Sequence, residues 1–397
     1  MNRKLAKSAS RDFIYSVLAL MVYNGVLQLV IYPFLNGKMG AEAFGTVLYL
    51  ISVVSVMGAS FGSGASYGRM VAKAHRTQTN GDYNIFLWGI AGISVFVSLI
   101  TLVVLHEFQI GLYLQLLVLM VISVFRYYAD VQYRMTIRFK EYFIFYAAIA
   151  AGNLLGIALY PVSKSWSLTV FLGEFLAVLF TFCSGTIFRK PFFEKSQDFK
   201  QNMHAVWVLS SANLVSALIL NSDRLLIRIL IGAQEVTTFY TATLIGKIVA
   251  MLTTPLNGII ISYLTNYKMK FTKKIFAGVC GMMLIVSLLA SGACTFISYY
   301  FVKIMYANVF EAAKPYFLLA NAGQIFYFIS GSLMVVVLNF TKEKYQLYIN
   351  IVYLIVFAVV VIPAILMFGL NGIAWGLLIT NIIRFIIVML VGFKFIQ

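Results

Sequence analysis

Charge is scarce in this chain, and negative charge is the scarcest. Only 11% of the 397 residues are charged, and 13 Asp and Glu residues stand against 30 Lys and Arg residues, giving a net charge of +17. A soluble globular protein carries about 25% charged residues, so this composition excludes an ordinary soluble globule. The three cysteines, Cys183, Cys280 and Cys294, lie in apolar segments without metal-type spacing, and we interpret them as small buried hydrophobic residues.

Motifs for catalysis and for nucleotide binding are also missing. The sequence has no Gly-rich loop ending in Lys-Ser or Lys-Thr, no His-Glu-x-x-His pattern and no nucleophile elbow. Its three histidines, His75, His106 and His204, fall in or beside predicted loops. We therefore expect no enzyme activity, no cofactor and no metal site, and an ATP-driven pump would need a partner chain.

Long apolar runs fill most of the chain. Hydrophobic residues make up 61% of the sequence, and its mean hydropathy is +0.91. A helix needs about 20 apolar residues to cross the hydrocarbon core of a bilayer. We therefore predict an all-α integral membrane protein with twelve transmembrane helices, near residues 12–35, 42–66, 83–104, 110–127, 142–163, 166–187, 206–231, 238–263, 275–298, 315–340, 345–367 and 370–393.

Connections rich in basic residues alternate along the chain with connections that are poor in them. Most fall in the segments that would share a side with both termini, whereas the other loops hold only Lys38, Lys164, Lys303 and Lys314. The positive-inside rule then places both termini in the cytoplasm. This placement accounts for the net positive charge without a nucleic-acid partner, and attraction to anionic membrane lipid is the expected side effect.

A polar stretch, Phe188 to His204, divides six predicted spans from six. Lys140-Glu141 and Pro161 bracket the fifth span, as Lys342-Glu343 and Pro363 bracket the eleventh. We predict an N-terminal lobe at 1–190 (helices 1–6), a cytoplasmic linker at 191–204 and a C-terminal lobe at 205–397 (helices 7–12). Six spans return the chain to the same side, so the lobes would be parallel repeats related by a pseudo-two-fold axis, with the substrate path between them.

Charged residues inside membrane spans are costly and are candidates for function. In the seventh span, polar residues at steps of three and four place Asn221, Arg224 and Arg228 on one helical face. The predicted substrate-binding residues are Arg224, Arg228, Lys247, Asn221, Asn24 and Gln28. The predicted ion-coupling or charge-pair residues are Asp223, Glu174 and Arg384.

Four cations, Arg224, Arg228, Lys247 and Arg384, against two carboxylates favour an anionic passenger with phosphate-like oxygens, which Arg binds in a bidentate way. Two simpler interpretations stay open. Asp223 could only neutralise a neighbouring Arg, and Arg228 could extend to the headgroups from the helix end.

A second charged pattern, Arg126, Asp130, Arg134 and Arg138, has a spacing of four residues. Residues four apart lie on the same side of a helix, where opposite charges form ion pairs. We interpret this pattern as a solvated helical face with ion pairs rather than as a binding site.

The residues from Asn221 to Ile227, followed by Gly232, Tyr240, Gly246-Lys247 and Pro255, resemble the seventh and eighth helices of the bacterial polysaccharide transporter family. This family belongs to the multidrug/oligosaccharidyl-lipid/polysaccharide exporter superfamily. The run Arg11 to Gly45, with its Gly40-Ala41-Glu42-Ala43-Phe44-Gly45 turn, is similar to the opening of O-antigen and capsule flippases.

The resemblance implies a V-shaped transporter in the bacterial cytoplasmic (inner) membrane. Such a protein moves an undecaprenyl-diphosphate-linked oligosaccharide from the inner to the outer leaflet by alternating access. H+ or Na+ as coupling ion, and a polysaccharide polymerase or chain-length protein as partner, stay open. The first span lacks an acidic residue in its apolar body, in contrast to many drug exporters of the superfamily. The alternatives are a cation-coupled small-molecule or multidrug exporter, and a membrane scaffold or lipid-modifying enzyme.

Overall fold

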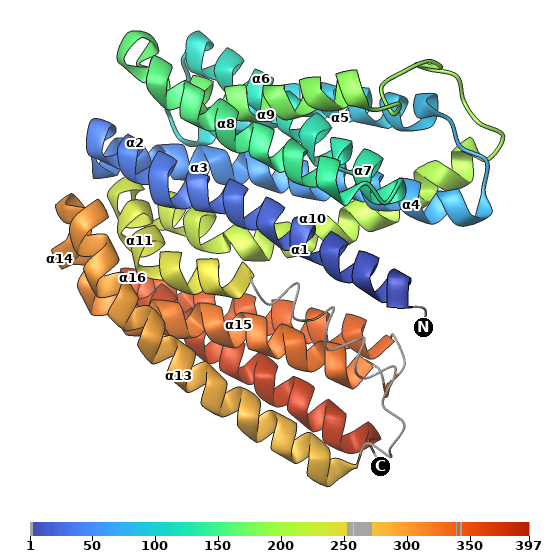
Figure 1. The fold of residues 1–397 in the computed structure, drawn as a ribbon. Coiled ribbons are helices and arrows are strands. Elements are labelled where there is room, and N and C mark those ends of the chain that lie inside the picture. Colours follow the sequence, from blue (N-terminus) through green and yellow to red (C-terminus); the bar gives the residue numbers. More distant parts are fainter. Residues whose placement is uncertain (1–2, 252–256, 258–271, 339, 342–343, 397) are drawn as a thin grey trace. The chain divides into compact units, whose positions relative to one another are not determined.

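The computed structural model describes residues 3–251, 257, 272–338, 340–341 and 344–396 (Figure 1). Within these residues the chain is helical, with no β-strand. Ten of the helical segments are long and apolar enough to cross a membrane. The predicted all-α membrane fold class is confirmed.

Helices in the first half follow the predicted spans closely. They are α1 (Arg3–Val26), α2 (Tyr32–Met39), α3 (Ala41–Met57), α4 (Ser63–His75), α5 (Asn80–Val104), α6 (Ile110–Ala129), α7 (Val131–Met135), α8 (Phe139–Ser163) and α9 (Trp166–Ser184). The first predicted span is realised as α1 and α2, and the second as α3 and α4. Each of these two pairs is continuous through a π-helical turn, at Leu27–Ile31 and Gly58–Gly62 respectively.

Helices in the second half are α10 (Phe199–Leu230), α11 (Ala233–Met251), α13 (Lys273–Met305), α14 (Phe310–Ala313), α15 (Phe317–Leu338) and α16 (Lys344–Phe395), with 3-10 turns at Ala307–Val309 and Lys314–Tyr316. The eighth predicted span, 238–263, coincides with α11 only as far as Met251, and most of its remainder lies outside the described residues. Pro255, which we expected to kink that span, lies there too.

The eleventh and twelfth predicted spans both lie within α16, which reverses direction at Gly369. Gly369 has φ 56° and ψ −130°, a backbone conformation that glycine adopts without the steric cost of a Cβ atom. The two arms then pack together, because a Cβ atom on Gly372 would lie 1.8 Å from the carbonyl oxygen of Ala364. Tyr353 in the first arm donates a hydrogen bond of 3.0 Å to Asn381 in the second. The element is therefore a hairpin of two helices, as predicted.

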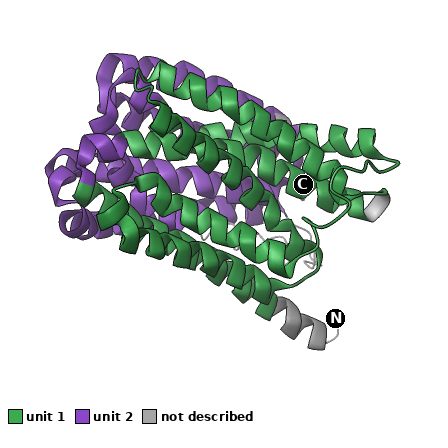
Figure 2. Ribbon diagram, turned by 90° about the horizontal axis from the view of Figure 1, so that it is seen from above, with its two compact units in different colours: residues 1–38, 46–225 green, residues 39–45, 226–397 purple. Residues whose placement is uncertain are grey.

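The chain forms two compact units, residues 1–38 with 46–225 and residues 39–45 with 226–397 (Figure 2). This grouping places α10 up to Leu225 in the first unit, and residues 199–204 of the predicted linker are already helical in α10. Grouping by packing need not follow a repeat boundary. The division at 191–204 into two six-helix lobes stays a prediction.

Aromatic side chains dominate the core of the first unit. Its central cluster combines residues of α1, α6, α7, α8 and α9, among them Ala19, Tyr133, Phe145 and Ile149. The Tyr133 hydroxyl hydrogen-bonds to Thr181 and Ser184 of α9, so this buried ring also has a polar partner. A separate cluster in the second unit joins α13, α15 and both arms of α16 through residues such as Phe276, Leu333 and Val388.

The segment 185–198 is held on the corner between α4 and α5. Asp82, which is fully buried, accepts hydrogen bonds from the backbone N–H and hydroxyl of Ser196 and from the amide of Asn202, at 2.8, 2.6 and 3.2 Å. Gly81 allows the close approach, since a Cβ atom there would lie 2.2 Å from the Glu194 carbonyl oxygen. The polar stretch that we predicted as a linker is therefore docked on the first unit through part of its length.

Candidate functional site

A buried ion pair joins α6 to α9. The Arg126 Nε and Nη2 atoms donate to the two carboxylate oxygens of Glu174, at 2.5 and 3.0 Å, and the two side chains are only 4% and 5% exposed. Two parallel hydrogen bonds of this kind are the strongest arrangement of an Arg and a carboxylate. Burial of an ion pair costs desolvation, which such geometry offsets. Glu174 thus lies in a charge pair, with Arg126 as its partner.

Tyrosines surround the guanidinium of Arg126. Its Nη2 atom donates to the Tyr23 hydroxyl of α1 at 3.4 Å, and its Cζ atom lies 3.8 Å from the centre of the Tyr127 ring. A cation over an aromatic face gains further electrostatic stabilisation. The pair is therefore enclosed by three helices, α1, α6 and α9.

Asp130 and Arg134 continue this polar region toward the end of α6. The Asp130 carboxylate accepts a hydrogen bond from Ser66 of α4 at 3.2 Å and lies 3.8 Å from Arg134. Asp130 is 8% exposed and Arg126 is 3% exposed. Our interpretation of Arg126, Asp130, Arg134 and Arg138 as a solvated face is therefore wrong for its first two members. The spacing of four was the available signal, but it does not distinguish solvent from polar partners on other helices.

A second buried arginine, Arg69 of α4, was not among the predicted site residues. It is 7% exposed, donates to the Tyr128 hydroxyl and donates to Asn80 Oδ1 at 2.6 Å. Its Cζ atom lies 5.0 Å from the centre of the Tyr83 ring. Its neutral partners and its contact with the first residue of α5 indicate a role in joining α4 to α5.

In α10, the predicted residues Asn221, Asp223 and Arg224 belong to the first unit. Arg224 Nη1 donates at 3.3 Å to the hydroxyl of Ser52, a fully buried residue of α3. Asp223 is 3% exposed. Asn221 donates from Nδ2 to the carbonyl oxygen of Ala217, within its own helix, at 2.9 Å.

Of the two predicted residues of the first span, Asn24 lies in α1 and Gln28 lies in the π-helical turn Leu27–Ile31. Asn24 donates within its own helix to the Leu20 carbonyl oxygen at 2.9 Å. Gln28 is 7% exposed, and its Oε1 atom accepts no hydrogen bond from the described residues. A buried polar atom without a partner is uncommon in native structures, and π-helical turns occur frequently at functional sites. Gln28 therefore keeps an acceptor available for a ligand.

The remaining predicted residues belong to the second unit. Arg228 and Lys247 are half-buried, in α10 and α11. Arg384 lies over two aromatic rings, with its Cζ atom 4.6 Å from the centre of Tyr327 and 4.9 Å from that of Tyr353. No carboxylate among the described residues forms an ion pair with Arg384. A common site for Arg224, Arg228 and Lys247 stays a prediction.

No metal-binding group of three or more His, Cys, Asp or Glu residues occurs in the described parts of the chain. The polar centre that the structure does show is the Arg126–Glu174 pair with its tyrosines. Its chemistry is that of charge pairing and hydrogen bonding between helices.

Scans against protein-family models and curated proteins find no match for this sequence. The fold, by contrast, is shared with solved transporters. Lipid II flippase MurJ in an inward closed conformation matches with a TM-score of 0.73 at 13% identity, over 95% of this chain and 87% of that one.

Two multidrug transporters share the fold as well. An inward-facing MATE family transporter of the MOP superfamily gives a TM-score of 0.66 at 11% identity, covering 95% of this chain and 97% of that one. The MATE multidrug transporter DinF-BH gives a TM-score of 0.61 at 14% identity, covering 99% of this chain and 96% of that one. The chain therefore has the fold of MATE and MurJ transporters.

Proposed function

We propose that this protein is a flippase that moves an undecaprenyl-diphosphate-linked oligosaccharide repeat unit from the inner to the outer leaflet of the bacterial cytoplasmic membrane by alternating access. One observation carries the proposal. Because Glu174 is paired with Arg126, the predicted set counts four cations, Arg224, Arg228, Lys247 and Arg384, against one remaining carboxylate, Asp223. The surplus of positive charge over the predicted site residues is larger than the sequence alone indicated.

Positive charge of this kind suits a lipid diphosphate. The sugar and diphosphate cannot cross hydrocarbon unaided, since unpaired charges in an apolar medium cost many kcal/mol, whereas the polyprenyl tail can stay in lipid. Arginines bind phosphate oxygens in a bidentate way, and Gln28 offers an unused acceptor to a sugar hydroxyl. The fold shared with lipid II flippase MurJ also supports the proposal of a flippase.

A cation-coupled small-molecule exporter is the second candidate. Asp130 is a buried carboxylate that accepts a hydrogen bond from Ser66. A buried carboxylate can bind and release H+ or Na+. The shared fold with multidrug transporters of the MATE family is consistent with this alternative. A cationic drug, however, would meet the basic surplus described above.

Arg224→Ala tests the proposal. We expect the variant to abolish export of the polysaccharide at normal protein levels, and Arg224→Lys to retain part of it because charge survives without the bidentate fork. Arg11→Ala is the matched control, since the Arg11 side chain is 69% exposed. Surface polysaccharide and the lipid-linked intermediates are measured together, the latter by mass spectrometry of extracted lipids.

The deletion strain separates the two candidates. Loss of a flippase should remove surface polysaccharide and leave undecaprenyl-linked repeat units in the inner leaflet, before any polymerase or chain-length partner can act on them. Unchanged intermediates with altered resistance to cationic dyes would support the exporter instead. Normal export by Arg224→Ala would restrict Arg224 to a structural role.

A further inference from the structure

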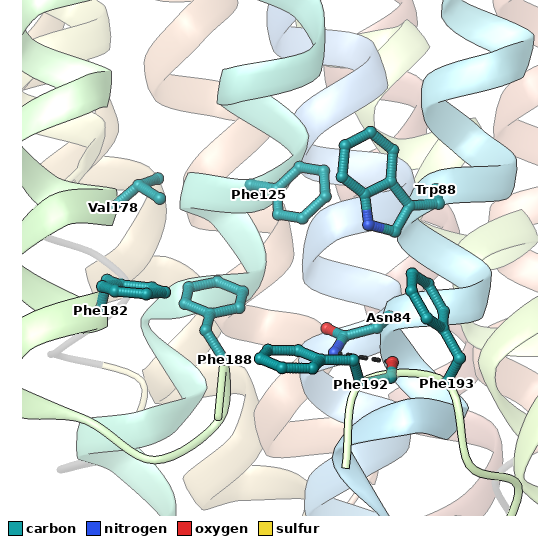
Figure 3. Close-up of a pocket in the computed structure, with 8 residues that line it drawn as sticks. All are labelled: Asn84, Trp88, Phe125, Val178, Phe182, Phe188, Phe192 and Phe193. Atoms are coloured by element: carbon teal, nitrogen blue, oxygen red, sulfur yellow. Dashed lines mark hydrogen bonds between the residues drawn. The ribbon is translucent and has the colours of Figure 1, made fainter. Parts of the chain in front are cut away.

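An apolar groove lies in the first unit, away from the predicted site residues (Figure 3). Its volume is about 220 Å³. Four elements form it, namely the first turns of α5, the last turns of α6, the second half of α9, and the docked segment after α9. The lining residues are Asn84, Trp88, Phe125, Val178, Phe182, Phe188, Phe192 and Phe193.

Water is a poor occupant of this groove. Besides the indole N–H of Trp88, its only polar side chain is Asn84, which already donates from Nδ2 to the Phe192 carbonyl oxygen at 3.1 Å (Figure 3). The volume would hold roughly seven waters at liquid density, yet each buried water needs two or more polar partners. Trp88 and Phe193 are 56% and 62% exposed, so the groove opens to the surroundings of the protein. A hydrocarbon chain therefore suits this groove better than water does.

Two exposed cations lie in the chain between two of the residues that line the groove. Arg189 and Lys190 are exposed and lie in the chain between Phe188 and Phe192. Neither residue forms an ion pair with any described residue. Their backbone is fixed, because the Arg189 carbonyl oxygen accepts a 2.9 Å hydrogen bond from the amide of Asn80. The backbone that carries these two cations is thus held next to residues that line the apolar groove.

We propose that this groove binds one anionic glycerophospholipid, with part of an acyl chain among the phenylalanines and the phosphate at Arg189 and Lys190. Basic side chains at a membrane surface attract anionic lipid. The walls are closely spaced rings, with the centre of Phe125 5.5 Å from that of Trp88 and 6.1 Å from that of Phe188. These neighbouring rings form a continuous apolar surface against which an acyl chain can pack. The site is independent of the transported substrate.

Trp88 supplies a direct probe. In full-length protein with the other three tryptophans replaced by Phe, Trp88 fluorescence is measured in bilayers that contain brominated phosphatidylglycerol or brominated phosphatidylcholine at equal mole fraction. We expect phosphatidylglycerol to bind more tightly by a factor of about five for each basic side chain. Replacing Arg189 and Lys190 together by Ser should remove this preference.

A filling variant tests the groove itself. Val178→Phe should lower quenching by both brominated lipids, whereas Val118→Phe, at a 50% exposed position of α6 outside the groove, should not. The circular dichroism spectrum and elution volume of each variant establish folding.

Several results would overturn the proposal. Equal quenching by the two lipids would remove the charge recognition, and unchanged quenching in Val178→Phe would remove the groove. Displacement of phosphatidylglycerol by an equimolar polyprenyl diphosphate would assign the groove to the lipid carrier, and absence of quenching by either lipid would show that neither enters the groove. Because lipid binding is read without transport, these outcomes are separate from the failure of the flippase proposal.

Discussion

Removing one member of the Arg126–Glu174 pair should destabilise the protein strongly. Both side chains are almost completely buried, so Glu174→Gln leaves the Arg126 charge without its carboxylate. Breaking a buried pair in this way costs about 3–5 kcal/mol. Replacing both residues by Met removes the desolvation cost together with the attraction, and such replacements are often neutral or stabilising. We therefore expect the double variant to recover most of the stability.

The free energy of unfolding can be measured for the wild type, both single variants and the double variant in detergent micelles with a denaturant titration. A coupling energy of about 3 kcal/mol or more between the two positions is expected, since residues in direct contact deviate from additivity. Arg11→Gln, at an exposed position, serves as the control and should change stability by less than about 0.5 kcal/mol. Single variants that each cost under about 1 kcal/mol, with additive effects, would show that the Arg126–Glu174 pair does not stabilise the protein.

Three further predictions address the docked segment and the topology. Gly81→Ala should destabilise by at least about 1 kcal/mol in thermal or denaturant unfolding, because its Cβ atom would meet the Glu194 backbone; Gly89→Ala on the same helix has open space and should be neutral or slightly stabilising. Hydrogen bonds from the backbone N–H and then the hydroxyl of Thr77 hold the pKa of Asp198 below its usual value of 3.8. The ionised Asp198 therefore stabilises the docked segment fully above pH 3.8, and this stabilisation is lost as the pH falls through the lower pKa of the folded state. Proteolysis of the docked segment against pH should show that loss, and Asp198→Asn should be equally susceptible across this range. A cysteine at exposed Ser163 should react with an impermeant maleimide in intact cells and one at exposed Gln197 should not, in a Cys183→Ser background because Cys183 is exposed; reversed labelling would contradict both the topology and the direction of transport.

The helices could be predicted because hydropathy depends on local composition. Even the reversal inside α16 was predicted, since a break near residues 368–369 separated two runs of the right length. The π-helical turns at Leu27–Ile31 and Gly58–Gly62 were not. The second turn lies where α6 packs closely, as a Cβ atom on Gly62 would lie 2.4 Å from the Val124 carbonyl oxygen of α6. A single sequence does not show which helix approaches that glycine.

The candidate site shows the same limit. Glu174 was predicted to be functional because a charge in a membrane span is costly, but its partner was assigned to a solvated face. Arg126 is 48 residues away from Glu174 in sequence and 103 from Tyr23. Contacts at such separations leave no periodic pattern. By contrast, the one-sided face of α10 was visible from spacing alone, because its residues belong to one helix.

The separation between Arg126 and Glu174 also bears on how the protein is made. Synthesis at about 5–20 residues per second delivers Glu174 roughly 2 to 10 s after Arg126, given the 48 residues between them. During that interval α6 contains an arginine that costs about 2.5–3.5 kcal/mol to place at the centre of a membrane. Arg126 lies within the last turn of α6, so its side chain can reach the headgroups while α8 and α9 are still being made. The ion pair between α6 and α9 can therefore form only after the segment that contains Glu174 has been made.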